Sequence, residues 1–515
     1  MTYKFRRNTT IGQLDAETDS FLESCFVTTD IYSILCDFDD KNSFIKRVIV
    51  GRTGSGKTAL LKKISTDTTV KKYDQIEAES TVFEHINNNV YVLELMRHGV
   101  DLRAFYKSLW LHVLLVKAIE TRFSVQSSFF EQIESMFQKT KRKGKFYEAH
   151  QYVETFKDHF FNPIIISEIT SKFETALSAE VGFFSGAAAK GGLTAENIEK
   201  IQTSTSRYVS TELLRKQKEL IKWLSEESTD SKIHTIISID DLDRSWLSAS
   251  KIRYDFINAL LDAIKEFVNF QGIKFLVSIR TDILMGIYRN NLRQEEKDKS
   301  FILPITWSRE EIVNLLDKRI DYLIKNQYAG KETVHFTDVF NFNVQGKPAI
   351  DFVLERTMLR PRDAIDFVNL SLAQAADSSV ELDEDAVILA EENFYNSRKA
   401  ALGKEWFSLY PHIQDYIDSL NYIKTREFSI AGISKEIKNE IVTFLSDRTQ
   451  KDDNDSEHTK ISIEFEELVK VWFTVGVIGI KKNEHLSVYS SFDKPDLDIS
   501  DMNKNFVIHP LFFRP

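Results

Sequence analysis

The chain contains few of the residues that crosslink small secreted proteins or interrupt helices. Its 515 residues include only two cysteines, 8 prolines and 18 glycines. Cys25 and Cys36 are too few for a disulfide framework, so we expect the protein in the reducing cytoplasm. The scarcity of glycine and proline argues against a loop-rich β protein and favours long helices.

Long apolar runs are also missing from the sequence. No window of about 18 apolar residues occurs, so no segment is expected to span a membrane. The nearest candidate, residues 181–192, is short and contains Lys190. The N-terminal residues, MTYKFRRNTT, lack the apolar core of a signal peptide.

Positive charge is not in excess. The chain has 67 Lys and Arg against 77 Asp and Glu, a net charge of −10. A general cationic field for nucleic acid is therefore absent, and DNA contact is expected only from a local patch. The basic run at 139–145 is interpreted as a solvated loop and not as such a patch.

With 42% hydrophobic residues the chain is globular, and its length predicts about three domains.

A phosphate-binding motif is the most informative segment that is present. Residues 51–58, GRTGSGKT, match G-x-x-x-x-G-K-[ST] at every fixed position. An apolar, strand-like run at 47–50 precedes them and a helix-like segment at 59–64 follows. Glycines let the backbone fold around an anion, and the helix adds its positive dipole end. We expect Lys57 to reach the β- and γ-phosphates and the Thr58 hydroxyl to ligate Mg²⁺. The predicted nucleotide contacts of the loop are Gly51, Arg52, Thr53, Gly54, Ser55, Gly56, Lys57, Thr58 and Ala59.

Two adjacent carboxylates follow the next clear strand, at 233–239. Asp240 is predicted to hold Mg²⁺ through water, and Asp241 is placed to act as the general base. Paired carboxylates at a buried strand end are costly unless a cation compensates them. The pair therefore indicates a metal or ligand site.

Arginines complete the predicted site. Arg280 ends a buried strand at 274–279 and could sense the γ-phosphate, because a guanidinium matches phosphate oxygens. Arg360 and Arg362 flank a proline at a helix start and could reach the nucleotide from a helical lid. Arg289 and Arg293 are weaker candidates for arginine fingers that act on a neighbouring subunit.

The order of strands and helices predicts an α/β fold with a parallel sheet, in which ligands bind at the carboxyl ends of strands. A strand is expected at 90–95, and one helical segment is expected over 351–375. Ser308 and Glu311 form a capping box before a helix at 312–324. Residues 1–45 form an N-terminal segment.

The remaining chain divides into three predicted parts. The P-loop core covers 46–305 and contains a large helical insertion at about 102–225. An all-α lid follows at 306–400. Residues 401–515 have the pattern of a winged-helix-like domain, with a helix at 465–473, a β-wing and a final strand.

Four motifs together, GRTGSGKT, IISIDDLDR, FLVSIR and LRPRD, resemble the additional-strand P-loop ATPases near the AAA+, STAND and KAP families. They are most similar to bacterial members with a DDLDR-type Walker B. The resemblance covers roughly residues 45–65 and 233–375. It implies that Lys57 and Thr58 are the Walker A pair and that Asp240 and Asp241 are the Walker B pair.

The resemblance also assigns the arginines. It implies that Arg280 is the sensor-1 arginine and that Arg362 or Arg360 is a sensor-2-like arginine. Asp241 stands where many AAA+ members have Glu, so a slow switch is as plausible as a fast motor.

Three functions follow from this resemblance. The first is a Mg²⁺-dependent ATPase switch that forms a homo-oligomer and acts with a separate effector in bacterial antiphage defence or stress signalling. The second is a DNA-binding loader or remodelling ATPase. The third is a nucleotide-stabilised scaffold with negligible turnover.

Overall fold

The computed structural model divides the chain into two compact units. One consists of Met1–Thr29, Val50–Lys62 and Pro304–Pro515, and the other of Asp30–Ile49 and Lys63–Leu303. The structure describes residues 5–6, 8–78, 83–123, 125–139, 146–162, 164–181, 195–227, 233–240, 242, 250–290, 292–328, 332–377, 382–452, 463–483, 486–490, 497, 501 and 503–514.

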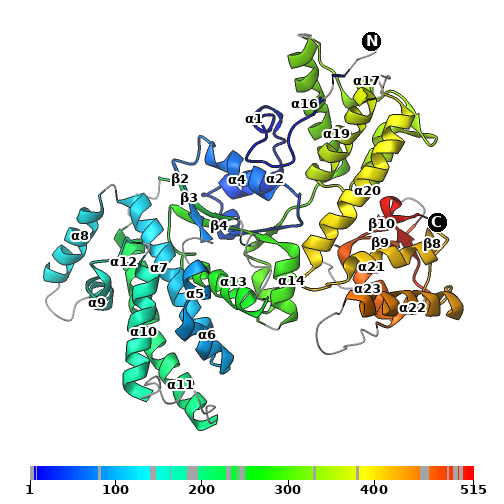
Figure 1. Cartoon of the computed structure of the whole chain (residues 1–515). Coiled ribbons are helices and arrows are strands. Elements are labelled where there is room, and N and C mark those ends of the chain that lie inside the picture. Colours follow the sequence, from blue (N-terminus) through cyan, green and yellow to red (C-terminus); the bar gives the residue numbers. More distant parts are fainter. Residues whose placement is uncertain are drawn as a thin grey trace. The chain divides into compact units, whose positions relative to one another are not determined.

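A five-stranded sheet forms the centre of the P-loop region (Figure 1). Its strands lie in the order β2-β3-β4-β1-β5, and the β2–β3 and β3–β4 pairs are parallel. The strands are β1 (Val48–Gly51), β2 (Lys72–Glu77), β3 (Thr235–Asp240), β4 (Ile273–Arg280) and β5 (Ile302–Pro304). Every residue of β3 is buried, as expected for a strand covered on both faces. The α/β fold with a parallel sheet is therefore confirmed.

The predicted strand at 90–95 is wrong, because this segment is the helix α6 (Val90–Arg97). Asn89 caps it, since the Asn89 side chain accepts a hydrogen bond from the Val92 amide at 2.9 Å. The edge strand next to β3 is instead β2. Its sequence, KYDQIE, is mostly polar and lacks the apolar run that predicts a buried strand.

The expected helical insertion is confirmed in the described residues. Its helices are α7 (Arg103–Arg122), α8 (Gln126–Lys139), α9 (Tyr147–Phe156), α10 (Ile165–Val181), α11 (Ala195–Tyr208), the π-helix η3 (Val209–Leu214) and α12 (Arg215–Glu227). Residues 140–145 of the basic run and residues 182–194 of the small-residue segment lie outside the described residues.

His112 lies in the aromatic core of the insertion and is fully buried. Its Nε2 lies 3.1 Å from the Phe160 carbonyl oxygen, and its Nδ1 lies 2.7 Å from the Tyr152 hydroxyl. A carbonyl oxygen can only accept, so Nε2 donates and Nδ1 accepts from the tyrosine. Burial lowers the pKa of His112 from its ordinary 6.5 to about 4.

This depressed pKa makes the insertion sensitive to acid. The unfolded chain binds the proton more readily, so the stabilisation is complete above pH 6.5 and is lost as the pH falls towards 4. The loss amounts to about 3 kcal/mol, at ~1.4 kcal/mol per pKa unit. We expect the unfolding free energy, measured in denaturant at several pH values, to fall less steeply in His112→Gln than in the wild type. Parallel pH profiles for the two proteins would contradict this.

The helix predicted after the glycine loop is confirmed as α4 (Lys57–Ser65). Other helices before residue 305 are α1 (Leu22–Cys25), α2 (Asp30–Cys36) and α13 (Ser250–Lys265). Shorter helices complete this part of the chain: α3 (Lys41–Ile45), α5 (Glu84–Asn87), α14 (Thr281–Arg289) and α15 (Glu295–Asp298).

Helices dominate the region after residue 305. They are α16 (Arg309–Tyr328), α17 (Phe336–Val339), α18 (Ala349–Arg356), α19 (Pro361–Asp377) and α20 (Glu384–Trp406), with a small hairpin of β6 (Asn343–Val344) and β7 (Lys347–Pro348). The helices α19 and α20 pack side by side (Figure 1). The capping box is confirmed, since the Glu311 amide donates to Ser308 Oγ at 3.1 Å and the Ser308 amide to Glu311 Oε2 at 2.7 Å.

The helical segment expected over 351–375 consists of two helices, α18 and α19, that are separated at 357–360. Met358 and Leu359 adopt left-handed backbone angles, with φ of +48° and +49°. Pro361 is the first residue of α19, where its missing N–H costs nothing, but it cannot continue the preceding helix. Because of this break, α18 ends at Arg356 and α19 begins as a new helix at Pro361.

The C-terminal region has helices around a four-stranded antiparallel sheet of order β10-β9-β11-β8. Its elements are α21 (Ile413–Asp418), η4 (Ser419–Tyr422), β8 (Glu427–Phe428), α22 (Lys435–Asp452), α23 (Phe465–Val475), β9 (Ile478–Lys481), β10 (Ser487–Val488), β11 (Phe506–Ile508) and η5 (Pro510–Phe512). The predicted helix, hairpin and final strand are present, whereas the winged-helix assignment stays a prediction. Among the described residues, no helix has the length and apolar character needed to span a bilayer.

Candidate nucleotide site

The glycine loop joins β1, which ends at Gly51, to α4, which begins at Lys57. Gly54 and Gly56 have φ of +81° and +94°, angles that residues with a Cβ rarely adopt. A Cβ on Gly51 would lie 2.3 Å from Ser55 Oγ. Backbone angle therefore favours glycine at positions 54 and 56, and close contact with the Ser55 side chain favours it at position 51.

Lys57 lies against the start of this loop. Its ammonium donates to the carbonyl oxygens of Gly51 at 3.0 Å and of Arg52 at 3.2 Å. The hydroxyls of Thr53 and Ser55 are buried and have no hydrogen-bond partner within the part of the chain that is described. Buried polar groups are normally satisfied, so orphaned hydroxyls in a phosphate-type loop fit a polar ligand.

The start of α19 packs directly on the glycine loop, within the same compact unit. The Arg362 amide donates to the Gly54 carbonyl at 3.3 Å. A Cβ on Gly54 would lie 2.9 Å from the Arg362 Cβ. The indole N–H of Trp307 donates to the Ser55 carbonyl at 2.9 Å. Trp307 is a contact that the motif search missed, since no local pattern links it to the loop.

Gly54→Ala should weaken phosphate binding, because the new methyl group meets both a strained backbone angle and the Arg362 side chain. We expect the affinity for a fluorescent nucleotide to fall at least about 10-fold, that is, by ~1.4 kcal/mol. Gly346→Ala is the matched control, since Gly346 has φ of +78° but nothing lies within 4 Å of an added Cβ. Equal affinities of the two variants would show that the loop shape is unimportant.

Both predicted lid arginines lie at the loop. Arg360 is 7% exposed, and its Nη1 donates to the Thr53 carbonyl at 3.2 Å. Arg362 instead donates through Nε to the Leu14 carbonyl at 3.0 Å. The Arg360 side chain thus contacts the backbone of the loop. The Arg362 side chain instead links the N-terminal segment to α19. Their sensor roles stay predictions.

Glu405, near the end of α20, is a second contact that sequence reasoning missed. Its Oε1 accepts from the Thr53 amide at 3.1 Å and from Arg52 Nε at 3.4 Å. Its Oε2 lies 3.5 Å from Arg360 Nη1. The side chain is 2% exposed. No sequence pattern links this glutamate to the loop, because the two lie 352 residues apart in the chain.

Asp240 and Arg280 belong to the second unit. Asp240 is the last residue of β3, lies opposite Glu77 of β2 and is buried. Asp241 lies outside the described residues. Arg280 ends β4 and forms a two-point ion pair with Asp282, with Nε–Oδ1 and Nη2–Oδ2 distances of 2.9 Å. This pair fixes the direction of the guanidinium at the strand end.

The two proposed arginine fingers differ in their surroundings. Arg293 is 5% exposed and pairs with Asp262 at 2.8 Å and Asp298 at 2.5 Å. A buried, doubly paired guanidinium is not available to a neighbouring subunit. Arg289 is exposed at the end of α14.

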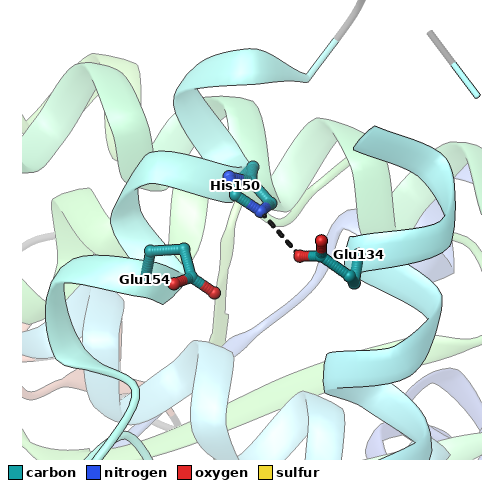
Figure 2. Close-up of side chains that lie close together, drawn as sticks. All are labelled: Glu134, His150 and Glu154. Carbon is teal, nitrogen blue, oxygen red and sulfur yellow. Dashed lines mark hydrogen bonds and ion pairs between the residues drawn. The ribbon is translucent and has the colours of Figure 1, made fainter. Parts of the chain in front are cut away.

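A separate polar cluster joins α8 to α9 (Figure 2). His150 Nε2 lies 3.1 Å from a Glu134 carboxylate oxygen, and Glu154 follows one turn after His150. The three residues could offer ligand atoms within 4.8 Å of one another. Lys157 already pairs with Glu154 at 3.4 Å, and the hydrogen bond from His150 lowers the pKa of Glu134. The cluster is thus satisfied as a polar link between two helices.

Two protein-family models match the sequence of this chain. Residues 27–303 match the KAP family P-loop domain, and residues 310–403 match the FunZ-associated C-terminal helical domain. No curated protein sequence matches the chain.

Two solved structures are similar over most of the chain. A Walker-type ATPase of Pyrococcus abyssi is 9% identical, with 93% of this chain and 94% of that chain covered and a TM-score of 0.32. The ORC2 protein of Aeropyrum pernix, in ADPNP-ADP complexes, is 13% identical, with 90% and 84% covered and a TM-score of 0.34.

The family match covers more than half of the chain and includes the complete glycine loop and the five-stranded sheet except for the last residue of β5. Together with the left-handed glycines and the lysine over the loop, it confirms the resemblance drawn from the motifs. The chain belongs to the KAP family of P-loop NTPases.

Proposed function

We propose that this NTPase binds ATP with Mg²⁺ and hydrolyses it to drive a conformational or oligomerisation switch. The observation that carries the proposal is the contact between the glycine loop and the lid helix α19 inside one compact unit. An ATP molecule bound by the loop would be sensed at once by Arg360 and Arg362, because both arginines already touch this surface.

The residues present fit a magnesium nucleotide. The Thr58 hydroxyl and the Asp240 carboxylate offer the oxygen ligands that Mg²⁺ prefers, and a bound Mg²⁺ would neutralise developing phosphate charge. Lys57 would exchange its two loop carbonyls for phosphate oxygens. Asp241 would take a proton from the attacking water, and Arg280 would stabilise charge on the γ-phosphate.

We further propose that the switch operates in the bacterial cytoplasm, as a homo-oligomer, with a separate effector in antiphage defence or stress signalling. This role rests on family resemblance alone. It would be contradicted if deleting the gene changed neither phage sensitivity nor survival under stress.

A DNA-acting ATPase is the second candidate. The helices and antiparallel sheet of residues 413–508 favour it, because their order suits a winged-helix-like domain. The net charge of −10 weighs against it. A nucleotide-stabilised scaffold is the third candidate and differs from both in its lack of turnover.

ATP turnover and particle mass, measured on the full chain with and without duplex and single-stranded DNA, separate these functions. The switch predicts turnover indifferent to DNA and a particle mass that changes with ATP. Turnover stimulated by DNA and reduced by added salt would favour the loader. Nucleotide binding without turnover would favour the scaffold.

A further inference from the structure

We propose that Glu405 is an internal competitor of the nucleotide, an anionic latch that rests on the glycine loop and is displaced when phosphate binds. The inference rests on the proposed function and adds a residue that sets nucleotide affinity. Glu405 already supplies an anionic oxygen to the loop, 3.1 Å from the Thr53 amide nitrogen. The loop motif uses backbone amides of this kind to hold phosphates.

Glu405 also neutralises two cations that a nucleotide would use. Arg52 lies 3.4 Å away on the loop, and Arg360 lies 3.5 Å away at the start of α19. Because one carboxylate serves two guanidiniums, it lowers the positive potential that both would offer to a phosphate. Burial and the nearby Arg360 charge lower the pKa of Arg52 to about 10, so the guanidinium still carries its charge at neutral pH.

The latch belongs to a largely buried chain of alternating charges. Its order is Arg52, Glu405, Arg360, Asp363, Arg398 and Asp366, with successive ion pairs of 3.4, 3.5, 3.9, 2.6 and 3.4 Å. The chain has three positive and three negative groups, so it is neutral as it stands. Phosphate added beside Arg52 and Arg360 would give each arginine a further anionic partner and weaken its hold on Glu405.

Arg52 connects this latch to the C-terminal domain. Its guanidinium lies 5.5 Å from the centre of the Trp406 ring. Trp406 directly follows Glu405 in the sequence. The Arg52 Nη1 lies 2.7 Å from where a Cβ of Gly476 would be. Gly476 has φ of +86° and caps α23 just before β9. A shift of Arg52 would therefore act on the turn at Gly476, between α23 and β9.

The test is the affinity for a fluorescent ATP analogue with Mg²⁺, measured in the wild type and in Glu405→Gln. The amide keeps the shape of the side chain but removes the competing charge, so we expect the analogue to bind at least about 5-fold more tightly. Glu391→Gln is the matched control, because Glu391 lies on the same helix and pairs with Arg356 at 2.5 Å. We expect its affinity to equal that of the wild type.

If Glu405 only stabilised the structure, Glu405→Gln would not bind the analogue more tightly than the wild type. Weaker or unchanged binding in Glu405→Gln, beside a wild type that binds, overturns the latch and leaves the proposed function intact. A wild type that binds no nucleotide would instead remove the proposed function. Hydrogen exchange of the wild type covers the case in which the variant does not fold. The analogue should speed exchange at residues 400–410, and slowed or unchanged exchange there overturns the latch.

Discussion

Replacing Lys57 with alanine should reduce ATP turnover by at least about 100-fold, the loss typical of removing one preorganised donor to transition-state charge, and should also weaken nucleotide binding. Lys57 is the invariant cation position of the motif, and its ammonium lies within 3.2 Å of two loop carbonyls. It is thus placed to transfer these hydrogen bonds to the phosphates when a nucleotide binds. Phosphate release and titration with a fluorescent nucleotide measure the two effects separately.

Lys62→Ala is the matched control for this variant. Lys62 lies on the same helix but donates to the carbonyls of Ala16 and Glu17 in the N-terminal segment. Its loss should leave both affinity and turnover near the wild-type values. Turnover that survives in Lys57→Ala would mean that the hydrolysis comes from another site or from a contaminant.

Asp241→Asn should separate binding from hydrolysis. The amide cannot accept a proton from water, and general-base catalysis contributes about 10²–10⁴-fold in rate. We therefore expect turnover to fall by at least about 100-fold while the affinity for ATP stays within a few-fold of the wild type. The variant should also retain bound ATP long enough for the particle mass of the ATP-bound assembly to be measured.

Asp240→Asn provides the comparison for Asp241. Asp240 is the predicted Mg²⁺ ligand at the end of β3, so its amide variant should need a higher Mg²⁺ concentration for half-maximal turnover. Asp241→Asn should leave that concentration unchanged. If the two variants behave alike, the division of roles between the adjacent carboxylates is wrong.

Local patterns predicted the parts of the fold in which short-range interactions decide the structure. The loop at 51–58, the buried strand β3 and the strand β4 carry apolar runs or fixed glycines that leave the backbone little choice. The capping box at Ser308 succeeded for the same reason, because both of its hydrogen bonds are made within four residues.

The failures concern segments whose neighbours decide their structure. The β-branched and aromatic residues of 90–95 favour a strand, but the Asn89 cap and burial on one face give a helix. In β2, polar residues were tolerated because pairing with β3 supplies the hydrogen bonds. Trp307 and Glu405 could not be found at all, since only the folded chain brings them to the loop.

The most direct measurement is equilibrium binding of ATP to the purified full chain with Mg²⁺, followed by phosphate release from the same sample. The account predicts saturable binding that requires Lys57, and phosphate release that requires both Lys57 and Asp241. Absence of binding at millimolar ATP in a folded wild-type protein, or binding that Lys57→Ala leaves unchanged, would contradict it.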